Sequence, residues 1–148
     1  MTVSIMRVAR TLGNLSRWSL SNLELQKIAF IAEMLYLGRT KEPLVNEDWQ
    51  AWAYGPVQPE LYHQAKIFGA DPVRDIFVAD LLDINSAEGQ ATNDAYNLMK
   101  VLTPGQMVNI THRPDGAWAR NYASGMRGKL IPKSDIRAEY ATLINDKQ

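Results

Sequence analysis

A helix that is apolar on more than one side is the feature of this sequence that most restricts its fold. Ser21 and Glu24 form a capping box, in which the serine oxygen accepts a hydrogen bond from an orphan N–H and the glutamate reaches back. Two apolar faces follow at helical spacing, one made by Leu25, Ile28, Ala32 and Leu35 and the other by Leu23, Phe30, Met34 and Leu37. Because such a helix is usually buried on both sides, we expect it at the centre of the fold, ending at Gly38.

Most of the remaining chain is predicted to be helical. Caps and apolar spacing indicate helices over residues 2–12, 59–68, 86–101, 103–112, around Trp118 and over 134–145. The first of these is expected to end near Gly13, and Ser134 or Asp135 is expected to cap the last.

Alternation of apolar and polar residues over 49–54 predicts a short strand that ends at Gly55-Pro56, and residues 130–132 are expected to be extended. The predicted fold is therefore mainly α. It is a compact single-domain helical bundle over residues 1–148, with a central buried helix and a short β segment around residues 49–57.

Charge and cysteine content argue against several kinds of site. The 148 residues have a formal net charge of zero, so the chain lacks the overall positive charge expected of a domain that binds duplex nucleic acid. The absence of cysteine removes disulfides and thiolate zinc sites. The apolar run over 28–37 is too short to span a bilayer, and the N-terminus has no secretory signal pattern. We expect a cytoplasmic protein with no cofactor, no metal, and no membrane or nucleic-acid partner.

Charged residues are concentrated in two stretches of opposite sign. Residues 71–94 contain six acidic residues and one arginine, whereas residues 113–137 contain six basic residues and two acidic ones. These stretches are either solvated faces, paired with each other within the fold, or a polarised surface for a charged partner. We favour the first interpretation because charge runs alone indicate little about function.

His63 and His112 are the histidines of the chain. An enzyme would need both imidazoles in one pocket with a carboxylate such as Glu60. The alternative, which we favour, is that one histidine caps a helix end and the other packs against tryptophans. No phosphate-binding loop, dinucleotide fingerprint or nucleophile elbow is present, so no catalytic residues are predicted.

Aromatic residues are more numerous than a helical core of this size needs, with four tryptophans and six tyrosines. Tryptophan and tyrosine are enriched at interfaces because each combines a large apolar body with a polar tip. We expect most of them in the core and one or two exposed as anchors for a partner.

Four segments together resemble a known family. They are L-E-L-Q-K-I at 23–28, A-W-A-Y-G-P-V at 51–57 continuing to P-E-L-Y-H at 59–63, the stretch from L-T to T-H over 102–112, and Trp118. This pattern resembles the SocA-like, or Panacea, antitoxin domain, which is common near phages and mobile elements. The resemblance covers residues 23–118.

The resemblance implies a non-enzymatic antitoxin that binds a cognate toxin protein, encoded next to it. Neutralisation would occur by direct blocking or by delivery of the toxin to a cellular protease. The motif residues that it points to as toxin-binding are Trp52, Tyr54, Gly55, Pro56, Tyr62, His63, Thr111, His112 and Trp118.

Two other functions remain open. One is a DNA-binding regulator with a basic face that includes Arg120, Arg127 and Lys129, and the other is a small enzyme that uses His63 and His112.

The glycine and proline of the second motif have a physical explanation. Gly55 is expected to relieve backbone strain in a turn, where Pro56 fixes φ, and this turn aims Trp52 and Tyr54 to one side. His112 is expected at a helix C-terminus, where the helix dipole favours its protonated form. We expect His112 to hydrogen-bond this turn and lock it.

Overall fold

Helices make up most of the structure. The computed structural model describes residues 2–123 and 128–146. Along these residues the elements are, in order, α1 (Ile5–Leu15), α2 (Asn22–Thr40), β1 (Trp49–Trp52), β2 (Gly55–Val57), α3 (Pro59–Ala65), the 3₁₀-helix η1 (Lys66–Phe68), α4 (Ala87–Met99), α5 (Pro104–Thr111), α6 (Ala117–Asn121), β3 (Lys129–Ile131) and α7 (Lys133–Asp146). The prediction of a mainly α fold with a short β segment is confirmed.

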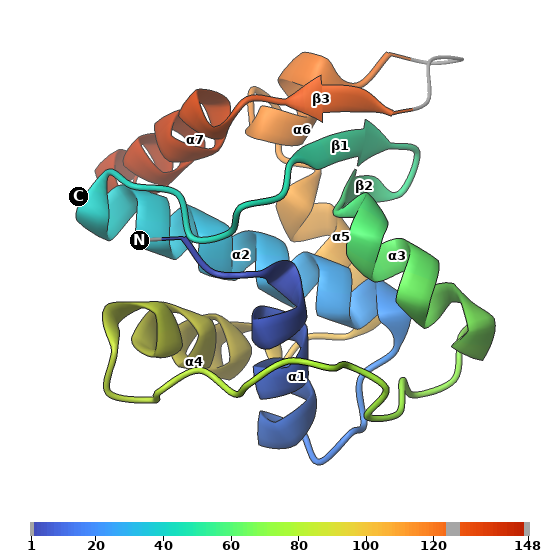
Figure 1. Cartoon of the computed structure of the whole chain (residues 1–148). Coiled ribbons are helices and arrows are strands. Elements are labelled where there is room, and N and C mark those ends of the chain that lie inside the picture. The colour runs from blue at the N-terminus through green and yellow to red at the C-terminus, as the bar shows by residue number, and fades with distance from the viewer. Residues whose placement is uncertain (1, 124–127, 147–148) are drawn as a thin grey trace.

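Helix α2 runs through the middle of the molecule. In Figure 1 it lies between α1 and α4 on one side and α7 and the sheet on the other. Its side chains are buried on all sides, and the fully or almost fully buried ones include Leu25, Ile28, Phe30, Ala32 and Met34. The expected central helix is therefore present.

Local interactions start α2 as predicted, but its end differs. The Ser21 hydroxyl accepts from the backbone N–H of Glu24 at 3.2 Å, and the Glu24 carboxylate accepts from the Ser21 N–H at 3.0 Å. The helix does not stop at Gly38, and Lys41 ends it in a left-handed conformation with φ of 64°. A Cβ atom at residue 38 would lie 2.1 Å from the Tyr140 ring, so this glycine allows α7 to pack closely on α2.

The predicted β segment is a hairpin within a three-stranded antiparallel sheet of order β2–β1–β3. Gln50 of β1 pairs with Val57 of β2 and with Leu130 of β3. The turn between β1 and β2 lies at Ala53 and Tyr54. Residues 55 and 56 therefore begin the returning strand, and the prediction that they end the first strand and form its turn is wrong.

The first and last helices also differ in their ends. Ser4 caps α1, which continues past Gly13 to Leu15. Gly13 makes room for the Trp18 ring, which lies where a side chain at residue 13 would be. Helix α7 begins at Lys133, earlier than the expected caps at Ser134 or Asp135. The Asp135 carboxylate instead accepts a hydrogen bond from the Asn121 side chain at 2.9 Å.

A buried carboxylate connects α2 to the sheet and to α7. Glu33 is fully buried and accepts hydrogen bonds from the Leu44 backbone N–H at 2.5 Å and from Trp49 Nε1 at 3.2 Å. The Lys133 ammonium also contacts this carboxylate, as an ion pair. The buried Trp49 ring packs edge-on against Phe30 with centroids 5.2 Å apart. This network fixes β1 on α2.

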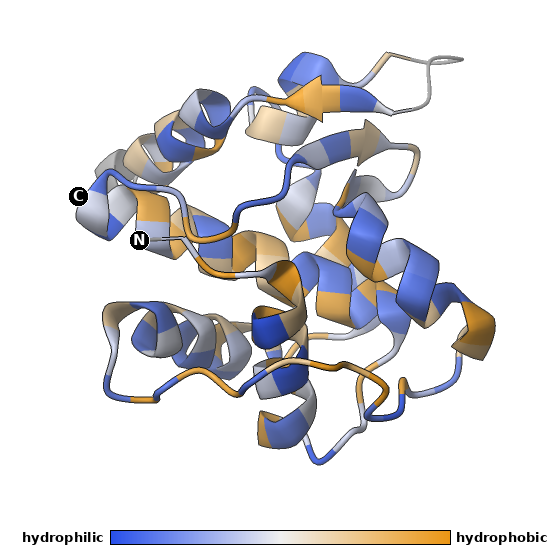
Figure 2. Ribbon diagram, viewed as in Figure 1, coloured by the Kyte–Doolittle hydropathy of each residue, from blue (hydrophilic) through white to orange (hydrophobic). Residues whose placement is uncertain are grey.

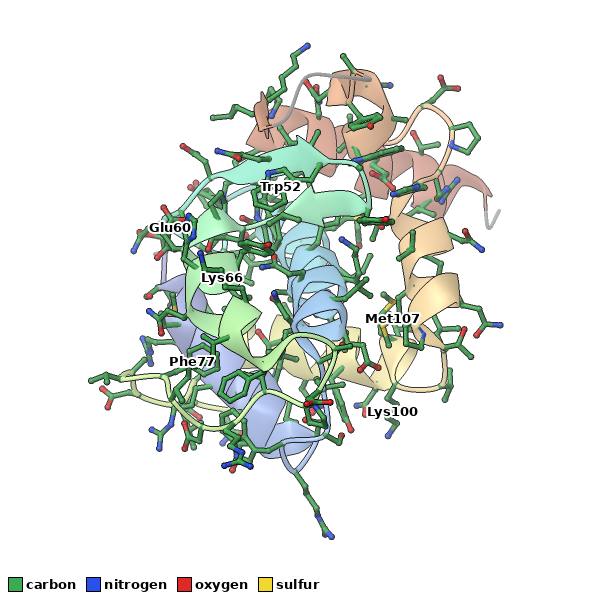
Figure 3. The ribbon with its side chains drawn as sticks, turned by 90° about the vertical axis from the view of Figure 1, so that its right-hand side faces the viewer. Trp52, Glu60, Lys66, Phe77, Lys100 and Met107 are labelled. Atoms are coloured by element: carbon green, nitrogen blue, oxygen red, sulfur yellow. The ribbon has the colours of Figure 1, made fainter. Side chains whose placement is uncertain are left out.

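The irregular segment over residues 71–85 crosses α1 (Figure 1) and carries several of the hydrophobic residues coloured in Figure 2. Phe77, labelled in Figure 3, is buried and stacks against Trp18 with centroids 6.3 Å apart. Arg10 donates to the Ala79 carbonyl at 2.9 Å and helps to hold the segment on α1.

The acidic stretch is partly neutralised by arginines of α1 and α2. Asp75 pairs with Arg10 at 3.3 Å, and Asp94 pairs with Arg39 at 2.8 Å. Two of its acidic residues are thus paired within the fold, although their partners lie outside the basic stretch. Within the described residues, no helix has the length and apolar character needed to cross a membrane.

Candidate functional site

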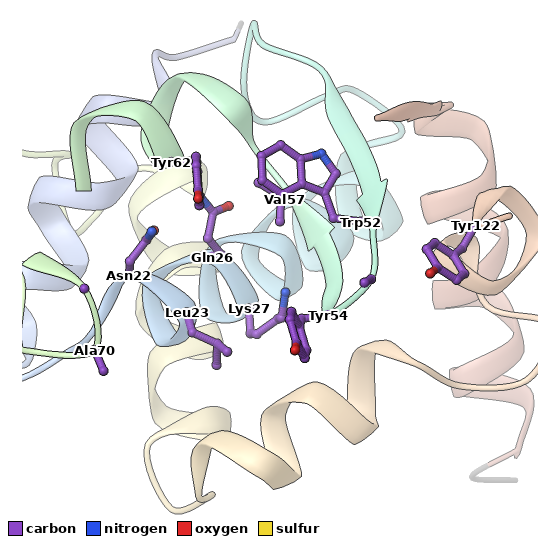
Figure 4. Close-up of a pocket in the computed structure, with 12 residues that line it drawn as sticks. Asn22, Leu23, Gln26, Lys27, Trp52, Tyr54, Val57, Tyr62, Ala70 and Tyr122 are labelled. Carbon is purple, nitrogen blue, oxygen red and sulfur yellow. The ribbon is translucent and has the colours of Figure 1, made fainter. Parts of the chain in front are cut away.

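A cavity of about 750 Å³ lies between the start of α2, the β1–β2 hairpin and α3, as Figure 4 shows. Its walls are largely apolar and aromatic, with Leu23, Trp52, Val57 and Tyr62 among the lining side chains. Trp52 and Tyr62 pack edge to face with centroids 4.8 Å apart. A concave apolar site of this size with a few polar groups is typical of ligand or side-chain binding.

Lys27 of α2 lines this cavity with its amino group. The residue is only 1% exposed, and its Nζ donates a hydrogen bond to the Pro56 carbonyl of β2 at 3.0 Å. Burial disfavours the charged form and lowers the pKa of the Lys27 ammonium to about 7. The L-Q-K segment of α2 therefore contributes a chemically distinct group that sequence analysis did not single out.

Close approach of three elements explains the glycine of the hairpin motif. Gly55 has φ of 118°, a conformation that L side chains rarely adopt. A Cβ atom there would lie 2.9 Å from Lys27 Nζ and 3.1 Å from Thr111 Oγ1. The motif segments of α2, β2 and α5 thus meet at this glycine.

Two aromatic side chains hold the turn of the hairpin. His112 stacks on Trp118 with ring centroids 3.7 Å apart and planes 2° apart. Trp118 Nε1 donates to the Trp52 carbonyl at 2.6 Å, and His112 hydrogen-bonds the backbone of Tyr54. Tyr122 stacks on the other side of Trp118 at 4.7 Å. The expected bond from His112 to the turn is present.

The surroundings of His112 disfavour the protonated form that was expected, so that prediction is wrong. Burial is the largest influence and lowers the pKa of this imidazole, although the hydrogen bond to Tyr54 opposes the change. The nearby Lys27 charge lowers the pKa further. His112 also forms the C-cap of α5, so one histidine both caps a helix and packs against tryptophan.

The second histidine has different neighbours. His63 is exposed on α3 and contacts Tyr62 edge-on, with centroids 5.9 Å apart. Glu60, the suggested carboxylate partner, contacts the side chain of Gln58. Neither histidine lines the cavity. Within residues 2–123 and 128–146, no cluster of three acidic or histidine side chains could hold a metal ion.

The aromatic anchor is at the tip of the hairpin. Tyr54 is 73% exposed and lines the mouth of the cavity, whereas Trp52, Tyr62 and Trp118 are half-buried. This agrees with the expectation that one or two tryptophans or tyrosines are exposed.

Two further polar residues of the site were also missed. Gln26 is buried and exchanges two hydrogen bonds with the backbone of Gln58, at 2.7 and 3.2 Å. Asn22 begins α2, and its buried Oδ1 has no hydrogen-bond partner within the described residues. The sequence did contain an indication of them, because Asn22 and Gln26 are polar residues in a helix that was predicted to be buried on both sides.

The residues suggested for a basic face are only partly described. Arg120 is exposed on α6 and donates to the Asp115 carbonyl at 3.0 Å, and Lys129 is exposed on β3. Arg127 lies outside the described residues.

Comparison with known proteins gives two matches. The family model described as antitoxin SocA-like, Panacea domain, matches residues 25–119. Antitoxin SocA of Caulobacter vibrioides (strain NA1000 / CB15N) is 27% identical over 109 residues, which cover 67% of this chain and 58% of that protein. The chain thus matches little more than half of its relative's length. No solved structure shows a significant match. The matched region includes Lys27, the hairpin, and the His112–Trp118 stack.

Proposed function

Because this chain belongs to the family of SocA-like antitoxins with a Panacea domain, we propose that it is the antitoxin of a toxin–antitoxin pair. It binds and neutralises a cognate protein toxin in the cytoplasm, and the toxin is encoded next to it. The family match over residues 25–119 is the observation that carries this proposal. The name of the SocA relative supports the same role.

The hairpin is the proposed centre of the toxin interface. Tyr54 is exposed at its tip, and a tyrosine with a fixed backbone offers a large contact area at low entropic cost. The residues proposed to contact the toxin are Trp52, Tyr54, Tyr62 and His63. The residues proposed to hold the hairpin in place are Gly55, Pro56, Thr111, His112 and Trp118.

Co-expression with the product of the adjacent gene tests this proposal. We expect this chain to restore the growth of cells that express the neighbouring product, and the two proteins to co-purify. A neighbouring product that stays fully toxic contradicts the proposal.

A substitution at the tip of the hairpin tests the interface. Tyr54→Ala should weaken the complex at least tenfold, since central aromatic residues dominate binding energy. Val101→Ala is the matched control because Val101 is equally exposed, at 76%, and does not line the cavity. Equal loss in both variants would argue against the hairpin.

The two routes of neutralisation, direct blocking and delivery to a protease, can be distinguished in the same cells. Direct blocking leaves the amount of toxin unchanged when the antitoxin is present. Delivery to a protease lowers the toxin level, and the level recovers in a host that lacks the protease. Immunoblots of the toxin after synthesis is stopped distinguish these two routes.

A further inference from the structure

The cavity beside the hairpin contains a buried lysine that no carboxylate of the described residues opposes. Lys27 Nζ makes one hydrogen bond to a described residue, to the uncharged carbonyl of Pro56. An ammonium group has three donors, and no acidic side chain is among the residues that line the cavity. The neighbouring titratable groups are His112 and the phenols of Tyr54, Tyr62 and Tyr122, and none of them is a carboxylate.

Such an arrangement favours an anionic ligand. Removing an unpaired charge from water is costly, and a hydrogen-bonded counter-ion repays part of that cost. Burial is the single cause of the lowered pKa of Lys27, so among the described residues no negative charge offsets it. A carboxylate that enters the cavity would supply that charge.

A second polar group of the cavity requires a donor. Asn22 is 9% exposed, and its Oδ1 is buried without a hydrogen-bond partner among the described residues. Buried acceptors are normally satisfied, so a ligand N–H group fits this position. Figure 4 shows Asn22 and Lys27 on the same helix, along one wall of the cavity.

The rest of the wall suits an apolar side chain. Leu23 of α2 and Val57 of β2 are aliphatic, and Trp52 and Tyr62 supply aromatic surface. The ligand must therefore combine a carboxylate, an N–H donor and an apolar group within a small volume.

We propose that this cavity binds the carboxyl-terminal residue of a partner polypeptide. The terminal carboxylate pairs with Lys27, a neighbouring backbone N–H serves Asn22, and the apolar side chain packs against Leu23, Val57 and Trp52. A chain terminus carries all three groups on one residue. An internal aspartate or glutamate carries its carboxylate at the end of the side chain, with no apolar group beyond it. The identification of this partner as the toxin rests on the proposed function.

Binding of small probes to the intact chain tests this inference without a toxin. N-acetyl-phenylalanine carries the carboxylate, the N–H group and an aromatic ring, and N-acetyl-phenylalaninamide has an uncharged amide in place of the carboxylate. Both are titrated at pH 6.5 into ¹⁵N-labelled protein and followed by backbone amide shifts. We expect the acid to bind at least tenfold more tightly than the amide, with shifts at Leu23, Lys27 and Tyr54.

Substitutions of Lys27 test whether its charge causes the preference for the acid. Lys27→Met should remove the preference for the acid, and Lys27→Gln provides a second uncharged variant should the first not fold. Lys66→Met is the matched control because this lysine is exposed on η1 (Figure 3) and does not line the cavity. It should leave the preference unchanged.

The inference is overturned by equal binding of acid and amide, by an unchanged preference in the folded Lys27 variants, or by shifts confined to other surfaces. Equally tight binding of N-acetyl-Phe-Glu-amide, which has no free terminus, would show recognition of an internal acidic side chain instead. The titration can fail while co-expression still restores growth, so the two proposals fail separately.

Discussion

Replacing Lys27 with methionine should change how the stability of the protein depends on pH. Lysine has a pKa near 10.5 in the unfolded chain, and burial lowers the pKa of Lys27 to about 7 in the fold. Between these values the unfolded state binds more protons than the folded state. The free energy of unfolding of the wild type should therefore rise with pH across this window.

The size of the effect follows from the two pKa values. Below pH 7 both states are charged, and the full cost of burying the ammonium, about 5 kcal/mol from a difference of about 3.5 pKa units, opposes folding. This cost falls by about 1.4 kcal/mol for each pH unit above 7 and is gone above pH 10.5. From pH 7.5 to 9.5 the wild type should gain about 2 to 3 kcal/mol relative to Lys27→Met.

Urea unfolding of both proteins at pH 7.5, 8.5 and 9.5 measures this difference directly. Comparison of the two proteins cancels the titration of all groups that they share. Lys66→Met is the control, because an exposed ammonium stays in water in both states and the difference should be constant. A constant difference for Lys27→Met as well would refute the reasoning, since it would mean that Lys27 is not desolvated by the hairpin.

Three further substitutions test contacts of the fold. His112→Ala removes the stack on Trp118 and should cost about 1 to 3 kcal/mol, so an unchanged Tm would rule out its structural role. Glu33→Ala leaves buried donors unpaired and should cost about 3 to 5 kcal/mol in urea unfolding, whereas a smaller loss would mean that water reaches them. Gly38→Ala, which normally stabilises a helix by about 1 kcal/mol, should instead cost about 1 to 3 kcal/mol because the Tyr140 ring fills the space. A higher Tm would contradict this packing.

Helix starts could be predicted because their causes are local. Ser21 with Glu24, and Thr103 with Gln106, each form the capping box that their spacing indicates. Glycines were less informative, since a glycine that ends a helix and one that admits a neighbouring ring are alike in sequence. Gly38 belongs to the second kind, and its partner is distant in the chain.

The site was predicted only in part for the same reason. The bond from His112 was predicted from the motif, and one or two exposed aromatic residues were expected without naming Tyr54. The burial of Lys27 depends on β2 and α5 closing over it. A lysine on a helix is usually exposed, and no local pattern marks this exception. Residues 130–132 were expected to be extended, but their pairing with β1 needed the three-dimensional structure.

Two of the bonds that anchor the hairpin, those from Trp118 and His112, end on main-chain atoms of Trp52 and Tyr54. Every amino acid provides such atoms, so the anchor does not depend on which side chains the tip carries. Ala53 and the Tyr54 side chain can therefore be substituted while both bonds are kept, so the side chains at the tip can vary without loss of these contacts.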